Sequence, residues 1–434
     1  MIAIFALLAL GGLMHAARSF APGAAQPGGT ELAFGFLLLA AYFAGKTFNK
    51  VGLPKLTGYI AAGIVAGPAM LDLVEKSMTV QLKLVGGVAT SILALQAGAE
   101  LNLTSVRPLL KVVASITFLA IFGTMVVLTG TLIVLRPVVP FLDALPVTHA
   151  VMVAASIGVA LSAQSPAVVM ALIAETRSEG VLTRTILTLV VVADLAVIIS
   201  YGVVSSAATA VIGGQIDLAA AIGGIGWEVF GSIGVGVFIG FMLGVFLIYI
   251  KQGVGLFTVM ICFVVAEVGH AVHLDPLIIA LTAGLYLENV SRADARDLEH
   301  QFEQASLPVY LVFFALAGAK LDLAALAALA LPVAVIVITR ATSLFVGCRL
   351  ATRGPDVDPV VRRLAWLGLV PQAGLALALA ELVRRTFPAF GDAAFALVVG
   401  VVATNELIAP VMLRIALLRS GEAGRRAVGD VGEH

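Results

Sequence analysis

Asp194 is the residue whose chemistry is hardest to explain by packing. It lies in a long apolar run and is the only charged residue between Arg184 and Asp217. Placing a carboxylate at the centre of a bilayer costs roughly 2.5–3.5 kcal/mol on insertion scales, so such residues are usually functional. A carboxylate there must be neutral, paired, or holding a cation. We expect Asp194 to carry protons and cations; the alternative is a fixed salt bridge to Arg340.

Two polar motifs, each containing a proline, interrupt other apolar runs. They read Ser162-Ala-Gln-Ser-Pro166 and Val370-Pro-Gln-Ala-Gly374. Their side-chain oxygens could bind a dehydrated hard cation, which prefers oxygen ligands. The residues concerned are Ser162, Gln164, Ser165 and Gln372. For each of them a local hydrogen bond to the backbone is the alternative.

Composition identifies the solvent in which these residues lie. Hydrophobic residues make up 60% of the 434 and charged residues only 12%, about half the charge of a soluble protein. The mean hydropathy is +1.08. The formal net charge of zero gives no indication of nucleic-acid binding, and no Walker, HExxH or dinucleotide-binding motif predicts an enzyme or a cofactor. Cys262 and Cys348 lie in apolar runs, where we expect inert core cysteines.

Apolar stretches long enough to cross a bilayer recur along the whole chain, so we predict an all-α polytopic membrane protein. The first stretch could be an extra helix or a cleaved export signal; we expect an extra N-terminal hydrophobic segment ahead of about thirteen core transmembrane helices. The predicted spans are 2–20, 31–48, 55–71, 83–99, 109–135, 147–174, 184–210, 219–250, 254–273, 275–290, 304–319, 324–349, 363–386 and 392–418.

The charges between these spans predict their orientation. If span 31–48 ends in the cytoplasm and the spans alternate from there, the cytoplasmic loops carry eighteen Lys and Arg residues and the opposite side seven. Cytoplasmic loops normally carry this excess. The sequence therefore predicts a cytoplasmic C-terminus.

Two halves of the chain resemble each other. Residues 97–103 (AGAELNL) match residues 317–323 (AGAKLDL), and the two proline motifs match at an offset of 205. The first of these segments ends on the cytoplasmic side and the second on the outside, so the repeats are inverted, as in many secondary transporters. The predicted divisions are an N-terminal segment 1–30, a first half 31–214, a linker helix 215–252, a second half 253–418 and a cytoplasmic tail 419–434.

The two prolines predict broken helices. Pro166 and Pro371 each remove a helical hydrogen bond, and the freed carbonyls are tolerated in a bilayer only against protein, water or an ion. One such break alone could be a simple kink. Because the two occupy matching places in the repeats, a pair of crossed discontinuous helices is the better interpretation.

Four features lie at one depth. Asp194 is ten residues from Arg184, or about 15 Å along a helix, and Arg340 is nine from Arg349, or about 13 Å. By the same measure the two prolines lie at about 12–14 Å, near the middle of a core roughly 30 Å thick. We expect Arg340 to neutralise the two oppositely directed half-helix ends, or to pair with Asp194 in one state. Glu406 we expect to make a helix-end or interhelix hydrogen bond.

These motifs resemble those of the cation/proton antiporter superfamily, within its bacterial sodium/proton and potassium/proton exchanger group. The resemblance covers about residues 31–418. The stretches that carry it are Gly58-Tyr-Ile-Ala-Ala-Gly-Ile-Val-Ala-Gly-Pro68, Ser162-Ala-Gln-Ser-Pro-Ala-Val-Val169, Ala193-Asp-Leu-Ala-Val197, 277–289 and Pro371-Gln-Ala-Gly-Leu375.

The resemblance implies a homodimer in the bacterial inner membrane, in which a core domain moves against a dimerisation domain. It implies that a cation and protons compete for Asp194, and that Arg340 is the family's membrane-embedded basic residue. Many relatives have Asp or Asn directly before the key Asp, where this chain has Ala193. One carboxylate in place of two favours electroneutral exchange. Ser162 and Gln164 also depart from the commoner threonine-containing break.

We therefore expect a secondary cation/proton antiporter, with Na⁺ favoured over K⁺ as the cation. A sodium-coupled organic-anion symporter can share crossed broken helices and is the main alternative, although the few intramembrane cations count against an anion substrate. A channel or a membrane sensor is a third class. No cofactor is expected.

Overall fold

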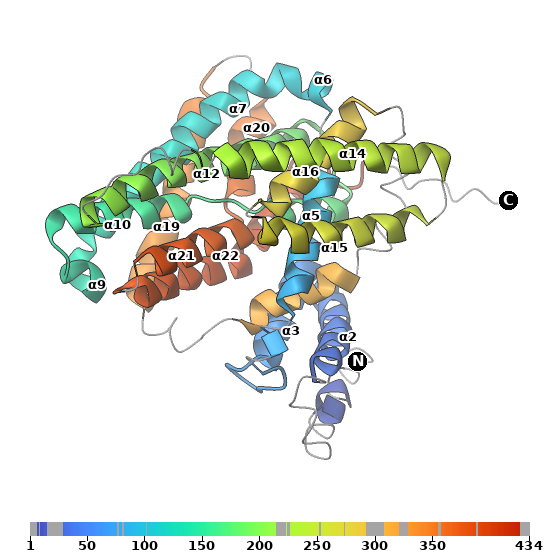
Figure 1. The fold of residues 1–434 in the computed structure, drawn as a ribbon, viewed down its shortest axis with the longest axis horizontal. Helices are drawn as coiled ribbons and strands as arrows, with labels where there is room; N and C mark the ends of the chain where they lie inside the picture. Colours follow the sequence, from blue (N-terminus) through green and yellow to red (C-terminus); the bar gives the residue numbers. More distant parts are fainter. Residues whose placement is uncertain are drawn as a thin grey trace. The chain divides into compact units, whose positions relative to one another are not determined.

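Figure 1 shows the computed structural model of the protein. All regular structure in the part it describes is helical, as the sequence predicted. The described residues are 7, 9–14, 29–75, 78–79, 82–100, 102–213, 223, 226–250, 253–272, 274–291, 308–320, 329–354, 357–387 and 389–425. Most of the predicted N-terminal segment, 1–30, lies outside them.

The chain forms two compact units, each made of separate stretches of sequence. The first comprises Met1–Asn102, Val229–Leu323 and Val428–His434; the second comprises Leu103–Glu228 and Ala324–Ala427. Each unit therefore draws on both of the predicted repeat halves. The division into inverted halves remains a prediction.

The helices of the first unit pack closely at glycines. A Cβ atom on Gly98 would collide with the backbone of Leu281, and one on Gly318 would collide with the backbone of Ile60. Gly284 and Gly63 are the facing glycines in the two pairs. The helices of this unit are α2 (Gly29–Lys50), α3 (Lys55–Ala66), α5 (Lys83–Glu100), α14 (Ser232–Tyr249), α15 (Val254–Ala271), α16 (Pro276–Asn289) and the helix Pro308–Ala319.

The second unit contains both proline motifs, and its helices α21 and α22 run side by side in Figure 1. Its main helices are α7 (Leu110–Ile116), η3 (Thr117–Phe122), α8 (Gly123–Val134), α10 (Val147–Ala160), α11 (Pro166–Thr176), α12 (Val181–Gly213), α19 (Ala330–Ala351), α20 (Pro359–Leu364), η6 (Ala365–Leu369), α21 (Gly374–Thr386) and α22 (Gly391–Arg419). Its short elements are α6 (Leu103–Val106), η2 (Arg107–Leu109), η4 (Arg136–Val138) and α9 (Pro140–Asp143).

Both predicted breaks are present. α10 ends at Ala160, and α11 begins at Pro166, whose fixed φ suits the first position of a helix. The second break separates η6 from α21, contains Pro371, and bends that span by 44°. Proline thus acts differently at the two breaks: it opens the second half-helix in one and lies within the non-helical link in the other.

The helices agree with a polytopic membrane protein. Among the described residues, six helices are long and apolar enough to cross a bilayer, and the bent pair is a seventh. Shorter apolar helices account for other predicted spans; they are Lys55–Ala66, Gly87–Ala99, Val147–Ala160, Pro166–Thr176, Gly255–Glu267, Pro276–Asn289 and Pro308–Ala319.

Candidate functional site

Helix α12 places Asp194 beside the first break. The side chain is 2% exposed, and its Oδ1 accepts a hydrogen bond from the backbone N–H of Gln164 at 3.3 Å. Because α10 ends at Ala160, this N–H lies outside the helical bonding pattern and is available to a neighbouring helix. The break and the carboxylate predicted to act together are therefore in direct contact.

The two serines of the first break make local hydrogen bonds. Ser162 Oγ donates to the carbonyl oxygen of Gly158 at 2.8 Å, and Ser165 Oγ accepts from the backbone N–H of Val168 at 3.2 Å. Ser165 is therefore the N-cap of α11, a position where serine is favoured. The alternative considered for these residues, a local backbone contact, describes both in this structure.

Gln164 is placed differently from the serines. Its side chain is 1% exposed, and its Nε2 donates to the carbonyl oxygen of Ser162. Its Oε1 is buried without a hydrogen-bond partner among the described residues. A buried acceptor normally has a partner, because an unmade hydrogen bond leaves its desolvation uncompensated. This oxygen is the strongest candidate in the break for a bound cation.

Arg340, on α19, joins the two breaks. The side chain is 1% exposed and donates four hydrogen bonds, all to backbone carbonyls. Nε donates to Leu161 O at 2.8 Å and Nη2 to Ala163 O at 3.1 Å, both in the first break. Nη1 donates to Val370 O at 2.8 Å and Nη2 to Leu369 O at 3.0 Å, both at the second.

This arrangement corresponds to the first of the two roles expected for Arg340. The carbonyls lie at the ends of α10 and η6, where helix dipoles place partial negative charge, so a fixed cation stabilises both. Arginine suits the position because its planar guanidinium presents five donors in a rigid fork.

Gln372 forms a second cross-link between the breaks. Its Nε2 donates to Leu161 O at 2.6 Å and to Ala163 O at 3.3 Å, and its Oε1 accepts from Asn405 Nδ2 at 2.6 Å. The Gln372 oxygen is thus engaged by an amide of α22. Gln372 therefore holds the backbone of the first break in place, which fits a supporting role better than the role of direct ligand considered from the sequence.

Asn405 was not predicted as a site residue. It is 2% exposed and lies on α22, the helix that matches α12 in the proposed repeat. Asp194 contacts the first break and Asn405 contacts the second, as equivalent residues of the predicted halves would. The offset between them, 211 residues, is close to that of the prolines and is the sequence signal that would have found it.

The site thus gathers one carboxylate, neutral oxygens and one fixed cation. Glu406, which follows Asn405 in the sequence, is also buried, whereas Glu267 of α15 is exposed. Within the described residues, no three His, Cys, Asp or Glu side chains are grouped so that they could hold a metal ion. This donor set can bind a proton or a single monovalent cation at the carboxylate.

Comparison with known families places this site in context. Residues 35–419 match the model of the sodium/hydrogen exchanger transmembrane family. The chain belongs to this family. It is therefore a multi-pass membrane transporter of the cation/proton antiporter superfamily, as the sequence predicted. No curated protein matches the chain at a significant level.

The exchanger fold also appears among solved structures. The sodium proton antiporter MjNhaP1 of Methanocaldococcus jannaschii, in a structure at pH 8, matches with a TM-score of 0.67 at 15% identity, covering 91% of this chain and 98% of that one. An electron-microscopy map of the same antiporter matches with a TM-score of 0.66 at 15% identity, covering 93% and 97%. At this identity the likeness shows a shared fold.

Proposed function

We propose that this exchanger moves Na⁺ against H⁺ in a one-for-one, electroneutral cycle, with both ions competing for Asp194; K⁺ is the second candidate cation. The observation that carries this proposal is the buried Asp194 carboxylate in contact with an interrupted helix. The family is described as sodium/hydrogen exchangers, and MjNhaP1 is a sodium proton antiporter, which favours Na⁺.

The chemistry follows from the donor set. Deprotonated Asp194 supplies the negative charge, and Gln164 Oε1 is a neutral oxygen ligand nearby in the break. A dehydrated cation prefers oxygen ligands, and a proton on Asp194 would remove the charge that attracts it. Binding of one ion therefore requires release of the other. Arg340 donates to carbonyls and remains charged, so it serves as a fixed counter-charge rather than a proton carrier.

Alternating access requires a moving element. We propose that the unit holding the breaks, α12 and α19 is the moving core of each protomer in a homodimer. The paired glycine contacts of the first unit support the inverted repeat, because Gly98 and Gly318 are 220 residues apart, the same offset as the sequence match. The inner membrane of a bacterium, with the C-terminus in the cytoplasm, is the proposed location.

The test is ion flux in proteoliposomes. An imposed Na⁺ gradient should drive proton movement, and Asp194→Asn should abolish it, because the amide cannot exchange a proton for a cation. Asp392→Asn is the control, since its side chain on α22 is 93% exposed. Parallel gradients of K⁺ and Li⁺ identify the preferred cation.

Three outcomes would contradict the proposal. Full exchange by Asp194→Asn would refute Asp194 as the carrier. A rate that responds to a clamped membrane potential would refute one-for-one exchange. Uptake of a labelled organic acid without proton counterflow would instead favour the sodium-coupled symporter.

A further inference from the structure

The chain turns back on itself after α22. We call residues Ser420–Gly424 the tail turn. Within it, Glu422 is 5% exposed, and its carboxylate accepts three hydrogen bonds from the start of α12. Oε1 accepts from Leu182 N at 2.8 Å; Oε2 accepts from Thr183 N at 2.8 Å and from Thr183 Oγ1 at 2.7 Å. Glu422 thus caps the Asp194 helix from a distant part of the sequence.

Such a cap has a clear physical basis. The first N–H groups of a helix have no partner within the helix, and a negative charge at that end is favoured by the helix dipole. Position 180, just before α12, is glycine, and a Cβ there would collide with the carboxyl group of Glu422. The local sequence therefore leaves room for this carboxylate to reach the helix.

The backbone of the tail turn also holds the segment between α11 and α12. Glu179 N–H donates to Glu422 O at 3.1 Å, and Gly424 N–H donates to Thr176 O at 2.9 Å. Gly421 has a φ of 72°, a conformation that glycine adopts without strain and that starts the turn. The tail turn therefore contacts both the last residue of α11 and the first turn of α12.

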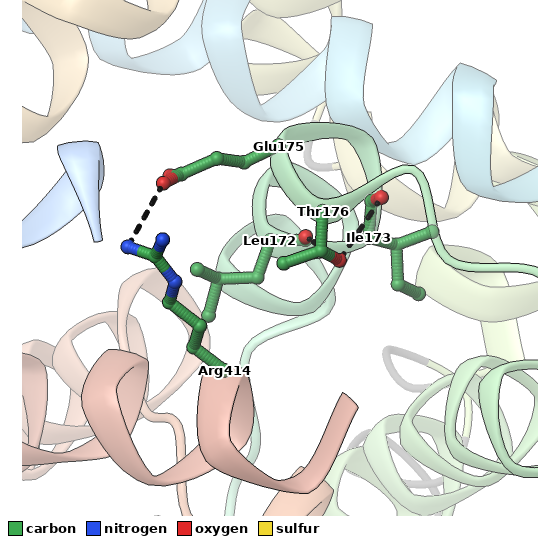
Figure 2. Close-up of polar contacts among 5 residues, drawn as sticks. All are labelled: Leu172, Ile173, Glu175, Thr176 and Arg414. Carbon is green, nitrogen blue, oxygen red and sulfur yellow. Dashed lines mark hydrogen bonds and ion pairs between the residues drawn. The ribbon is translucent and has the colours of Figure 1, made fainter. Parts of the chain in front are cut away.

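An ion pair reinforces the same end of the unit. Figure 2 shows Arg414 of α22 beside Glu175 near the end of α11, with 3.6 Å between Arg414 Nη1 and Glu175 Oε1. The adjacent Thr176 hydroxyl donates to the carbonyl oxygen of Leu172 at 2.7 Å. The end of α11 is thus tied to α22 by a side-chain pair as well as by the tail turn.

These contacts join α11 to α12 near both ends of α11. At the site, the N–H of Gln164 meets Asp194; at the other end, the tail turn binds Thr176 and Leu182. From Pro166 to Thr176 the chain rises about 15 Å as helix, and from Leu182 to Asp194 about 18 Å. Since both helices are rigid over these lengths, the tail turn determines how α12 is set along its axis relative to the break.

We infer that Glu422 is a positioning residue of the ion site, which acts through α12 to set Asp194 against the first break. This inference rests on the proposed function, since the site must bind a cation for its position to be measurable. It assigns a role in transport to a residue beyond the last membrane helix. Without the cap, the first turn of α12 frays and the helix can shift along its axis. The cation then binds to a less ordered pair of ligands, Asp194 and Gln164.

The test compares Glu422→Gln with the wild type. Glutamine has the same size but loses the charge and one acceptor. We expect faster hydrogen–deuterium exchange at residues 181–185. We also expect the apparent KM for Na⁺ to rise roughly fivefold, which corresponds to the loss of a typical N-cap, while the maximal rate changes little. Gly180→Ala should give the same pattern, because its methyl group displaces the carboxylate without removing it.

Glu179→Gln is the matched control. Its side chain is exposed, and the substitution keeps the backbone N–H that contacts the tail turn. Both measurements should be unchanged in it. Unchanged hydrogen exchange in Glu422→Gln would overturn the cap, and faster exchange with an unaltered KM would overturn the positioning role. If the wild type shows no Na⁺/H⁺ exchange that depends on Asp194, the proposed function fails, and the positioning role fails with it.

Discussion

At the scale of single residues, the site depends on how each oxygen is used. Ser162, Ser165 and Gln372 have partners for their side-chain oxygens or hydroxyl groups within the fold, whereas the buried Gln164 Oε1 has none among the described residues. The sequence could predict that these polar groups lie at one depth, because helical rise is constant. It could not rank them, because the ranking depends on side-chain conformations that only the packed structure fixes.

Gln164→Met tests the ranking directly. Methionine is close in size to glutamine but lacks the amide oxygen. We expect the apparent KM for Na⁺ to rise by about tenfold or more, since a buried polar contact to a charged group is worth roughly 1.5–3 kcal/mol. Proton flux in proteoliposomes, measured over a series of Na⁺ concentrations, gives this KM. Ser162→Ala serves for comparison and should have the smaller effect; an unchanged KM in Gln164→Met would exclude its oxygen as a ligand.

Arg340→Lys tests the fixed counter-charge. Lysine keeps the charge but offers three donors from one atom, and these cannot reach carbonyls in both breaks. One or two buried carbonyls would lose their hydrogen-bond partners, at a cost of roughly 1–3 kcal/mol each. The expected result is a clear fall in the thermal unfolding temperature of the detergent-solubilised protein, together with weak exchange. Wild-type stability in this variant would mean that the charge alone is sufficient.

At the scale of helices, sequence reasoning predicted both breaks and gave Arg340 a role at both half-helix ends as one of two possibilities, but it did not identify Asn405 or Glu422. Pro166 and Pro371 are visible as helix-breaking residues in apolar runs. Apart from its offset from Asp194, Asn405 looks like an ordinary polar residue of α22, and its contact with Gln372 reveals its role. Glu422 lies in the predicted cytoplasmic tail, and its role is not visible in the sequence because capping across 240 residues leaves no local pattern.

The glycine contacts between helices give a prediction at this scale. Gly98→Ala and Gly318→Ala each place a methyl group against backbone atoms of a neighbouring helix, which cannot move aside as a side chain can. Both should lower the unfolding temperature by similar amounts, because they occupy equivalent places in the proposed repeat. Gly35→Ala of α2, which has open space around it, is the control. Tolerance of both substitutions would argue against tight packing at these sites.

At the scale of the whole molecule, the family match and the charge distribution give two kinds of information about the protein, its family and its membrane topology. Residues 35–419 match the exchanger family, and loop charges predict how the chain is threaded through the membrane. Neither the pattern of spans nor the loop charges identifies the transported ion, because both reflect the bilayer rather than the cargo. The identity of the cation must be inferred from the few polar atoms of the candidate site.

The threading can be checked with a reporter. A green fluorescent protein fused to the C-terminus folds and fluoresces in the bacterial cytoplasm but not after export to the periplasm. The excess of Lys and Arg in the predicted cytoplasmic loops favours a cytoplasmic C-terminus, so the fusion should be fluorescent. Alkaline phosphatase fused at the same point should be inactive. The reverse pattern would invert the proposed topology.

The hydrogen bond between Asn405 and Gln372 has a consequence for the roles of the two halves of the site. A carboxamide neither gains nor loses a proton in the physiological range, so this contact is the same whether the surroundings are acidic or alkaline. In the proposed cycle, its counterpart in the first half, between Asp194 and Gln164, would change whenever a proton or cation binds. If the proposed repeat and ion site hold, one half would act as a constant reference, and ion occupancy would change the other half relative to it.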